Sequence, residues 1–514
     1  MSEIVFKRSM NIGTISAESD TEFLEQCFIE TPEYEELCDF NSKKMILLGR
    51  TGSGKTALLN KIKEDVDYYI EVRPDTFALQ YITNIPFVSR MESDNVNLDI
   101  FYKFLWLHEL ISQIIKNYFS YNKKNWIEEL SKRVSDNGRI RQLKKYIDEY
   151  EGIFFDEGST EKITKDMEQQ IVASLGNTIA NIQGKLTDSQ KSEIESKASQ
   201  YINKKQISQL KNIITLFKEC FASNKQKKIV VVIDNLDENW IKQSSKYRLI
   251  DALLNAIRLF VDVPNLKILL AMRADLLAKT FEITHRQNEK DEAFTIRLNW
   301  TPKMIKELLD KRIEYLFSYK YRKNTRITFS DLFDFLIDDI PAVDYIVSRT
   351  MMRPRDAISF VNICICEADS ESSISKENVL SGEEIFKRER YTALNHEWGD
   401  VYGNIETYFK IIQMLGNKFK YKDLLNQECF SQIEILAYEN NTLAEKFMVR
   451  KTDDSTVKES IIKELINILF TIGIIGIKDN KTNRINYSTP VRPALTVLDF
   501  TDTMSFEVHP LFKK

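Results

Sequence analysis

A glycine-rich segment near the start of the chain has residue types and a spacing suited to holding phosphate groups. Residues 49–56 read G-R-T-G-S-G-K-T and fit the pattern G-x-x-x-x-G-K-[ST] at every position. The glycines let the backbone curl so that successive N–H groups face an anion, and a following helix would add its N-terminal dipole. The residues predicted to contact a nucleotide here are Gly49, Thr51, Gly52, Ser53, Gly54, Lys55, Thr56 and Ala57.

Two of these side chains have specific expected roles. We expect Lys55 to reach the β- and γ-phosphates of ATP or GTP, and the Thr56 hydroxyl to ligate Mg²⁺. No motif that would read the base is evident, so the pattern leaves ATP and GTP open.

A second motif follows an apolar run later in the chain. Ile229–Ile233 is an unbroken β-branched run, and Asp234 comes directly after it. A buried strand that ends in a carboxylate is the arrangement that delivers one ligand to the magnesium shell of a phosphate-binding site. We therefore predict Asp234 as the second protein ligand of the metal.

The hydrolytic base is less sharply indicated. Asn235 follows the expected metal ligand, and an amide cannot act as a base. Glu238 is the preferred candidate to polarise water, with Asp237 as the alternative, although Asp237 could instead cap the next helix. Slow hydrolysis of ATP is the expected consequence.

Arginines in two other segments are candidates for contacting the nucleotide. Arg273 ends another apolar run, and the ends of strands line the ligand crevice in this class of fold; a plain salt-bridged arginine is the alternative. Arg353 and Arg355 flank Pro354 at the start of an expected helix, where cations oppose the helix dipole. A bound polyphosphate would explain them, so we predict that one of the two contacts it, with Arg353 slightly preferred over Arg355.

Five short β-rich runs must position these residues. Helical patterns lie between them, and this alternation predicts an α/β fold with a parallel, doubly wound sheet. The runs are Lys44–Leu48, Tyr68–Val72, Ile229–Ile233, Lys267–Met272 and Phe294–Leu298.

The remaining patterns divide the chain into four expected parts. An N-terminal segment (1–40) packs on a core (41–300) that carries a large helical insertion at about 99–223. A helical lid (301–395) begins with Thr301 and Pro302, a good helix start. In the last part (396–514), helices precede two short strands at Ile474–Lys478 and Arg484–Tyr487, which predicts a winged-helix-like domain.

Composition narrows the class of protein. The chain has 514 residues and a formal net charge of -4, so no global basic field indicates nucleic-acid binding. Its six cysteines fit no zinc spacing and predict buried, reduced thiols, typical of the cytosol. We find no signal peptide, and the longest apolar run, about 12 residues, is shorter than the roughly 20 of a membrane span. A cytoplasmic protein is expected.

With these motifs in place, the chain resembles the AAA+ and STAND branch of P-loop ATPases. The order of core, lid and winged helix is similar to that of origin-recognition initiator ATPases. The strings VVVIDNLDE, RPRD and FEVHPLF look closer to a poorly characterised set of bacterial P-loop ATPases, some of whose relatives are encoded in phage-defence loci.

The resemblance implies an ATP- and Mg²⁺-dependent switch that controls self-association or the binding of a separate effector protein. A DNA-binding initiator or regulator is the main alternative, with the winged-helix region docking either DNA or protein. A small-molecule kinase is permitted by the loop but disfavoured by the long insertion and the domain order.

Overall fold

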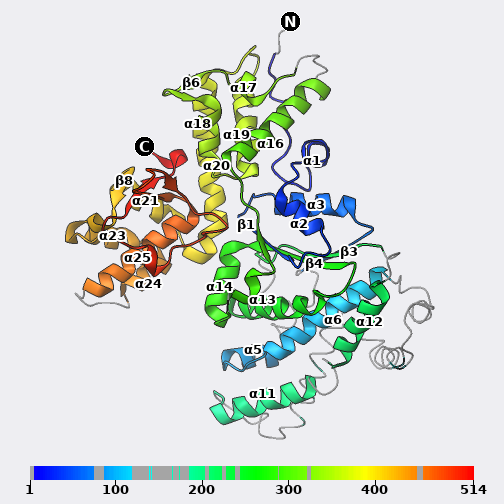
Figure 1. The fold of residues 1–514 in the computed structure, drawn as a ribbon. Helices are drawn as coiled ribbons and strands as arrows, with labels where there is room; N and C mark the ends of the chain where they lie inside the picture. The colour runs from blue at the N-terminus through cyan, green and yellow to red at the C-terminus, as the bar shows by residue number, and fades with distance from the viewer. Residues whose placement is uncertain are drawn as a thin grey trace. The chain divides into compact units, whose positions relative to one another are not determined.

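The computed structural model describes residues 5–73, 86–118, 185–202, 208–222, 227–237, 243–287, 289–320, 326–448 and 455–514, with isolated residues at 138, 141, 165, 169 and 173. Two compact units contain them (Figure 1). The first, here called the sheet unit, contains Thr31–Leu48 and Leu58–Ile296. The second, here called the C-terminal unit, contains Met1–Glu30, Gly49–Ala57 and Arg297–Lys514.

A five-stranded parallel sheet organises the sheet unit, as the sequence predicts. Its order is β2-β3-β4-β1-β5, so β4 lies between β1 and β3. In the parallel register, Ile233 of β3 is opposite Val72 of β2 and Leu270 of β4. The strands are β1 (Ile46–Gly49), β2 (Tyr68–Val72), β3 (Ile229–Ile233), β4 (Leu266–Arg273) and β5 (Thr295–Arg297).

The three adjacent strands β3, β4 and β1 are covered on both faces, which explains why they are nearly continuous apolar runs. Along β3, Ile229, Val231 and Ile233 join the large core cluster, and Val230 and Val232 point to the other face. Helices α6 and α13 lie on one side of the sheet and α2 and α3 on the other (Figure 1). Their bounds are α2 (Pro32–Cys38), α3 (Lys55–Asp65), α6 (Asp99–Tyr118) and α13 (Gln243–Ile257).

The described part of the predicted insertion is helical. α6 is buried along most of its length, and Trp106 donates its indole N–H to the Leu249 carbonyl of α13 at 2.9 Å. Most of the middle of the insertion lies outside the described residues. The other helices of this unit are α5 (Pro86–Ser93), α11 (Asp188–Ile202), α12 (Ser208–Phe221), α14 (Ala274–Thr284) and α15 (Glu289–Glu292).

A helical layer forms the first part of the C-terminal unit. Thr301 caps α16 by accepting the Met304 N–H, as the Thr-Pro start predicts. Phe6, Met10 and Phe23 join the core of this layer, where Arg312 also forms a buried ion pair with Asp20. The helices are α1 (Thr21–Cys27), α16 (Pro302–Tyr315), α17 (Phe329–Leu332), α18 (Ala342–Arg349), α19 (Pro354–Glu367) and α20 (Lys376–Tyr402), with a short β6 (Leu336–Ile337) and β7 (Ile340–Pro341) hairpin.

The last part of the chain adds helices around a four-stranded antiparallel sheet of order β10-β9-β11-β8. The prediction of a two-stranded ribbon is therefore wrong in its strand number. The strands are β8 (Lys418–Lys420), β9 (Ile475–Lys478), β10 (Ile485–Asn486) and β11 (Ser505–Val508). The helices are α21 (Ile405–Leu415), α22 (Tyr421–Leu424), α23 (Gln427–Ala437), α24 (Asn441–Met448) and α25 (Ser455–Ile472).

Membrane spans and disulfides are both absent from the described residues. No helix there is long and apolar enough to cross a bilayer. All six cysteines are free thiols; Cys27, Cys220 and Cys364 are buried, as predicted, whereas Cys38, Cys366 and Cys429 are half-buried.

Candidate functional site

The glycine-rich loop, residues 49–56, has the curled backbone that its sequence predicts. β1 leads into it, and α3 begins at Lys55. Gly52 and Gly54 have φ of +75° and +91°, where a side chain would be strained. At Gly49, an added Cβ would lie 2.4 Å from the Ser53 Oγ, so glycine is needed there for space. The Lys55 ammonium donates to the Arg50 carbonyl at 3.2 Å.

A tryptophan that the sequence did not single out lies against this loop. Trp300 donates its indole N–H to the Ser53 carbonyl at 2.7 Å. Its ring edge also lies 4.0 Å from the position of a Cβ on Gly54. Trp300 therefore holds the loop from the start of the helical layer. Nothing in the sequence indicated this contact, because Trp300 lies in no motif.

Of the two arginines that flank Pro354, Arg355 lies at the loop. Its backbone N–H donates to the Gly52 carbonyl at 3.3 Å, and its side chain lies 3.1–3.6 Å from a Cβ built on Gly52. The side chain is exposed, and its Nε donates to the Ile15 carbonyl at 3.1 Å. A cation is thereby placed directly beside the loop backbone.

Arg353 has a different environment. It is 1% exposed, and its Nη1 lies 2.8 Å from the Glu397 carboxylate of α20. The two residues before it, Met351 and Met352, both have positive φ (50° and 52°), an unusual conformation for non-glycine residues. The sharp turn that they form directs Arg353 into the interior as an anchor between α19 and α20.

Arg50, a variable position of the loop motif, connects the loop to the last part of the chain. Its guanidinium donates to the carbonyls of Ile472 at 3.1 Å and Ser488 at 3.0 Å, and to that of Thr471 at 3.5 Å. Thr471 and Ile472 end α25, where carbonyl groups carry the negative end of the helix dipole. A Cβ added to Gly473 would lie 2.6 Å from the Arg50 Nη2, so the guanidinium fits closely over this glycine.

Positive charge gathers around this contact. Burial, followed by the charges of Arg50, Arg349 and Arg353, lowers the pKa of the His509 imidazole to about 3. His509 is 3% exposed and donates its backbone N–H to the Ile474 carbonyl at 2.8 Å. The VHPLF segment is thus packed into the C-terminal unit, with Val508, His509 and Leu511 buried.

The acidic candidates lie at the end of β3 in the sheet unit. Asp234 is half-buried, and its Oδ1 accepts the Asn235 N–H at 2.8 Å. Asn235 has φ of 62°, a left-handed conformation that Asn tolerates better than most residues. Asp237 is exposed, and its carbonyl accepts from the buried Lys246 ammonium at 3.0 Å. Glu238 lies outside the described residues.

Arg273 ends β4, as predicted, and its guanidinium is engaged. It is 8% exposed and makes a two-point contact with Asp275, Nε to Oδ1 at 3.0 Å and Nη2 to Oδ2 at 2.8 Å. The structure therefore shows the salt-bridged arrangement that the sequence left open for this residue.

No group of three or more His, Cys, Asp or Glu side chains that could hold a metal ion occurs among the described residues. The predicted magnesium ligands, Thr56 and Asp234, supply one hydroxyl and one carboxylate oxygen donor. Mg²⁺ is commonly held by one or two protein oxygens, with water and substrate phosphates completing the shell. The hydroxyl and carboxylate fit that chemistry.

Comparison with protein families finds one matching domain. A family model described as "FunZ-associated C-terminal helical domain" matches residues 303–395. This stretch runs from α16 to within α20 and includes Arg353 and Arg355. It includes neither the glycine-rich loop nor any strand of the five-stranded sheet.

A curated protein of Escherichia coli (strain K12), the "Putative transposon gamma-delta 80.3 kDa protein", is similar over most of this chain. The two are 21% identical over 502 residues, which covers 94% of this chain and 64% of the relative. The chain thus spans less than two thirds of the length of that relative.

Proposed function

We propose that this protein is a P-loop ATPase of the AAA+/STAND type that acts as a nucleotide-dependent switch. The glycine-rich loop binds the phosphates of ATP, Thr56 and Asp234 hold Mg²⁺, and the start of α19 and the end of α25 change their contacts with the loop when nucleotide binds. The altered state then favours self-association or capture of a partner protein. In this assignment 303–395 is the lid and the antiparallel sheet with its helices is a winged-helix-like domain.

The sheet order supports a nucleotide role for the strand ends. In a parallel sheet the carboxyl ends of all strands meet at one edge, where ligands of this fold class bind. With β4 between them, β1 and β3 are two strand spacings apart, about 9–10 Å. The half-buried carboxylate of Asp234 at the end of β3 therefore suits a metal ion bound to a polyphosphate.

The observation that carries the switch is the bond network of Arg50. Its carbonyl accepts from Lys55, the residue expected to bind phosphate, and its guanidinium binds the end of α25. A phosphate competes with that carbonyl for the Lys55 ammonium, because a charge-assisted bond is stronger than one to a neutral oxygen. Through Arg50, a change at Lys55 on nucleotide binding is transmitted to the end of α25.

Arg355 provides a second connection, between the loop and α19. Its N–H bond to Gly52 joins the start of α19 to the loop. A ligand shifts an equilibrium only if it interacts differently with the two states. The exposed Arg355 guanidinium meets that condition, since it can leave the Ile15 carbonyl to contact phosphate.

Nucleotide binding is the first test. We expect Mg·ATP to bind the wild-type protein in calorimetric titration, and Lys55→Ala to weaken binding at least tenfold. Lys61→Ala is the matched control, because Lys61 lies on the same helix and, among the described residues, pairs only with Glu64. Equal affinities in wild type and Lys55→Ala would exclude the proposed site.

Coupling is tested separately by hydrogen–deuterium exchange of residues 470–490. In the wild type, a non-hydrolysable ATP analogue should speed exchange there, because Arg50 releases the end of α25. In Arg50→Ala exchange should be fast already and should not respond to the analogue. If the wild type binds ATP without any change in this segment, the protein is an ATPase but not this switch.

A DNA-binding regulator is the second candidate. The name of the E. coli relative connects that protein with a transposon, which is a DNA element. In this chain, Lys478, Lys481 and Arg484 are exposed on β9 and the turn to β10. A salt-titrated duplex-binding assay with and without ATP distinguishes this candidate, which fails if no binding occurs at low salt.

A further inference from the structure

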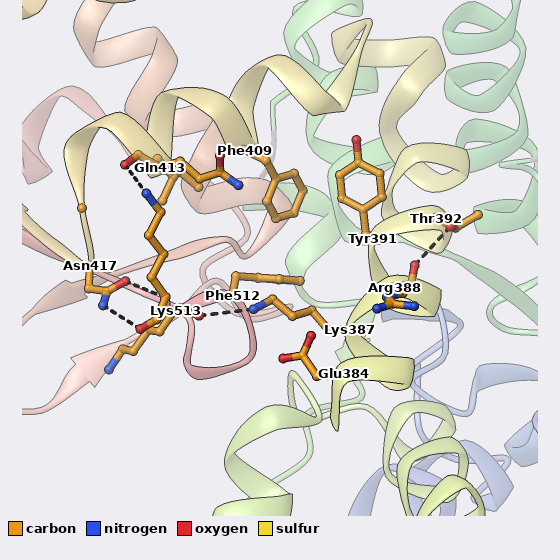
Figure 2. A pocket seen from close by; sticks show the side chains of 13 residues that line it. Glu384, Lys387, Arg388, Tyr391, Thr392, Phe409, Gln413, Asn417, Phe512 and Lys513 are labelled. Carbon is orange, nitrogen blue, oxygen red and sulfur yellow. Dashed lines mark hydrogen bonds between the residues drawn. The ribbon is translucent and has the colours of Figure 1, made fainter. Parts of the chain in front are cut away.

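A cavity of about 420 Å³ lies in the C-terminal unit (Figure 2), and no residue of the glycine-rich loop lines it. One wall is a face of α20, another is the end of α21 with the turn after it, and the third is the segment from Phe512 onward. Small-molecule sites in proteins typically enclose roughly 300–1,000 Å³. The cavity therefore has the size of a ligand site.

Aromatic rings form its apolar part. The Phe409 ring lies between those of Tyr391 and Phe512, with a centroid distance of 5.0 Å to each. Figure 2 shows Tyr391 and Phe409 side by side on neighbouring helices. A planar heteroaromatic ring gains stacking energy on such side chains.

Cations form its polar part. Four lysine or arginine side chains and the single carboxylate of Glu384 line the cavity. Lys513 is neutralised by Glu507. Lys387 and Arg388 have no ion-pair carboxylate in the described part of the chain; the Lys387 ammonium donates only to the Lys513 carbonyl, at 3.3 Å. Two adjacent cations on α20 are thus available to an anion.

Neutral polar groups complete the lining. Within the described ranges, the Tyr391 hydroxyl and the Gln413 side-chain amide make no hydrogen bond, and both residues line the cavity. An amide can donate and accept at once, which matches the mixed donors and acceptors on the edge of a nucleobase.

We propose that this cavity binds a nucleotide unit, with the base stacked on Tyr391 and Phe409 and the phosphate bound by Lys387 and Arg388. Two sources share this chemistry, a free nucleotide and one unit of a single-stranded nucleic acid. The proposal is independent of ATP binding at the glycine-rich loop.

The test uses the full chain carrying Lys55→Ala, so that the glycine-rich loop does not contribute to binding. Fluorescence anisotropy measures a labelled dT12 oligonucleotide at 50 mM salt, and AMP is added as a competitor. Competition by AMP identifies a free-nucleotide site; binding of dT12 without competition identifies a strand site. If neither ligand binds with a Kd below 1 mM, the proposal is wrong.

Variants locate the site. Tyr391→Ala should weaken binding roughly 5- to 100-fold through lost stacking. The pair Lys387→Ala and Arg388→Ala should weaken it at least tenfold and, for dT12, reduce the salt slope by about 0.7, the contribution of one neutralised phosphate on a single strand. Lys376→Ala is the control on the same helix, where Lys376 pairs with Asp338. Binding that none of the cavity variants changes, or equal binding of duplex dT12·dA12, would overturn the assignment.

Discussion

Arg353 and Arg355 are two residues apart, yet their surroundings predict opposite outcomes of mutation. Arg353→Ala leaves the Glu397 carboxylate buried without its cation, which costs about 3–5 kcal/mol. Arg355→Ala removes an exposed side chain and should change stability by no more than about 0.5 kcal/mol. We expect only Arg355→Ala to lower ATP affinity, roughly tenfold, without unfolding the protein.

Thermal unfolding and calorimetric titration of the two variants check this. Arg355→Lys is a useful companion, because it keeps the charge but loses the planar donor geometry. An Arg355→Ala protein that binds ATP normally would remove this residue from the proposed site.

At this scale the sequence predicted the curled backbone of residues 49–56, since the glycines stand where φ is positive or space is short; nucleotide contact by these residues stays a prediction. The sequence slightly favoured Arg353 over Arg355, whereas the turn at Met351 and Met352 buries Arg353 and leaves Arg355 at the loop. It also missed Arg50, whose partners are backbone carbonyls that leave no side-chain pattern. Asn235, which follows the predicted metal ligand, has a left-handed φ of 62°, a conformation that Asn tolerates better than most residues.

The contact between the loop and the end of α25 makes Gly473 the most informative position at the scale of elements. An alanine there must adopt a φ of +89° and displace the Arg50 guanidinium. We therefore expect Gly473→Ala to cost more in the wild type than in an Arg50→Ala background, with a coupling of roughly 0.5–3 kcal/mol.

A double-mutant cycle of unfolding free energies measures the coupling. Gly416→Ala is the control, because Gly416 also has positive φ (+80°) but nothing lies within 4 Å of an added Cβ. Its cost should be the same in both backgrounds. A cycle for Gly473 that closes to zero would show that Arg50 does not hold this element.

Elements that bury a continuous apolar run were predicted with nearly correct bounds, including all five parallel strands. The strands β8 and β11 were missed because they are short and bury only alternate residues, such as Phe419 in β8. β11 also pairs with β8, more than eighty positions earlier in the chain, and with β9. A pattern of neighbouring residues cannot indicate that two segments so far apart in the chain pair with each other.

Acid should weaken each unit separately, since each contains one buried histidine. Burial lowers the pKa of His108 in the sheet unit and of His509 in the C-terminal unit to about 3. The unfolded chain binds these protons near pH 6.5. Stability is therefore complete above pH 6.5 and is lost as pH falls toward 3, by about 2 kcal/mol per histidine at pH 5.

Unfolding midpoints at pH 7 and pH 5 test this prediction. His108→Leu and His509→Leu should each reduce the loss between the two pH values, and their effects should add because the histidines lie in different units. An identical loss in wild type and both variants would contradict it.

During synthesis, β1 is made long before the two strands that pair with it. β1 ends at Gly49, but its neighbours β4 and β5 begin at Leu266 and Thr295. At about 5–20 residues per second, a ribosome needs roughly 10–45 s to complete the first of them, β4. Throughout that interval the apolar segment Ile46–Leu48 has neither of its sheet partners. This segment can take its place between β4 and β5 only after both strands have been made.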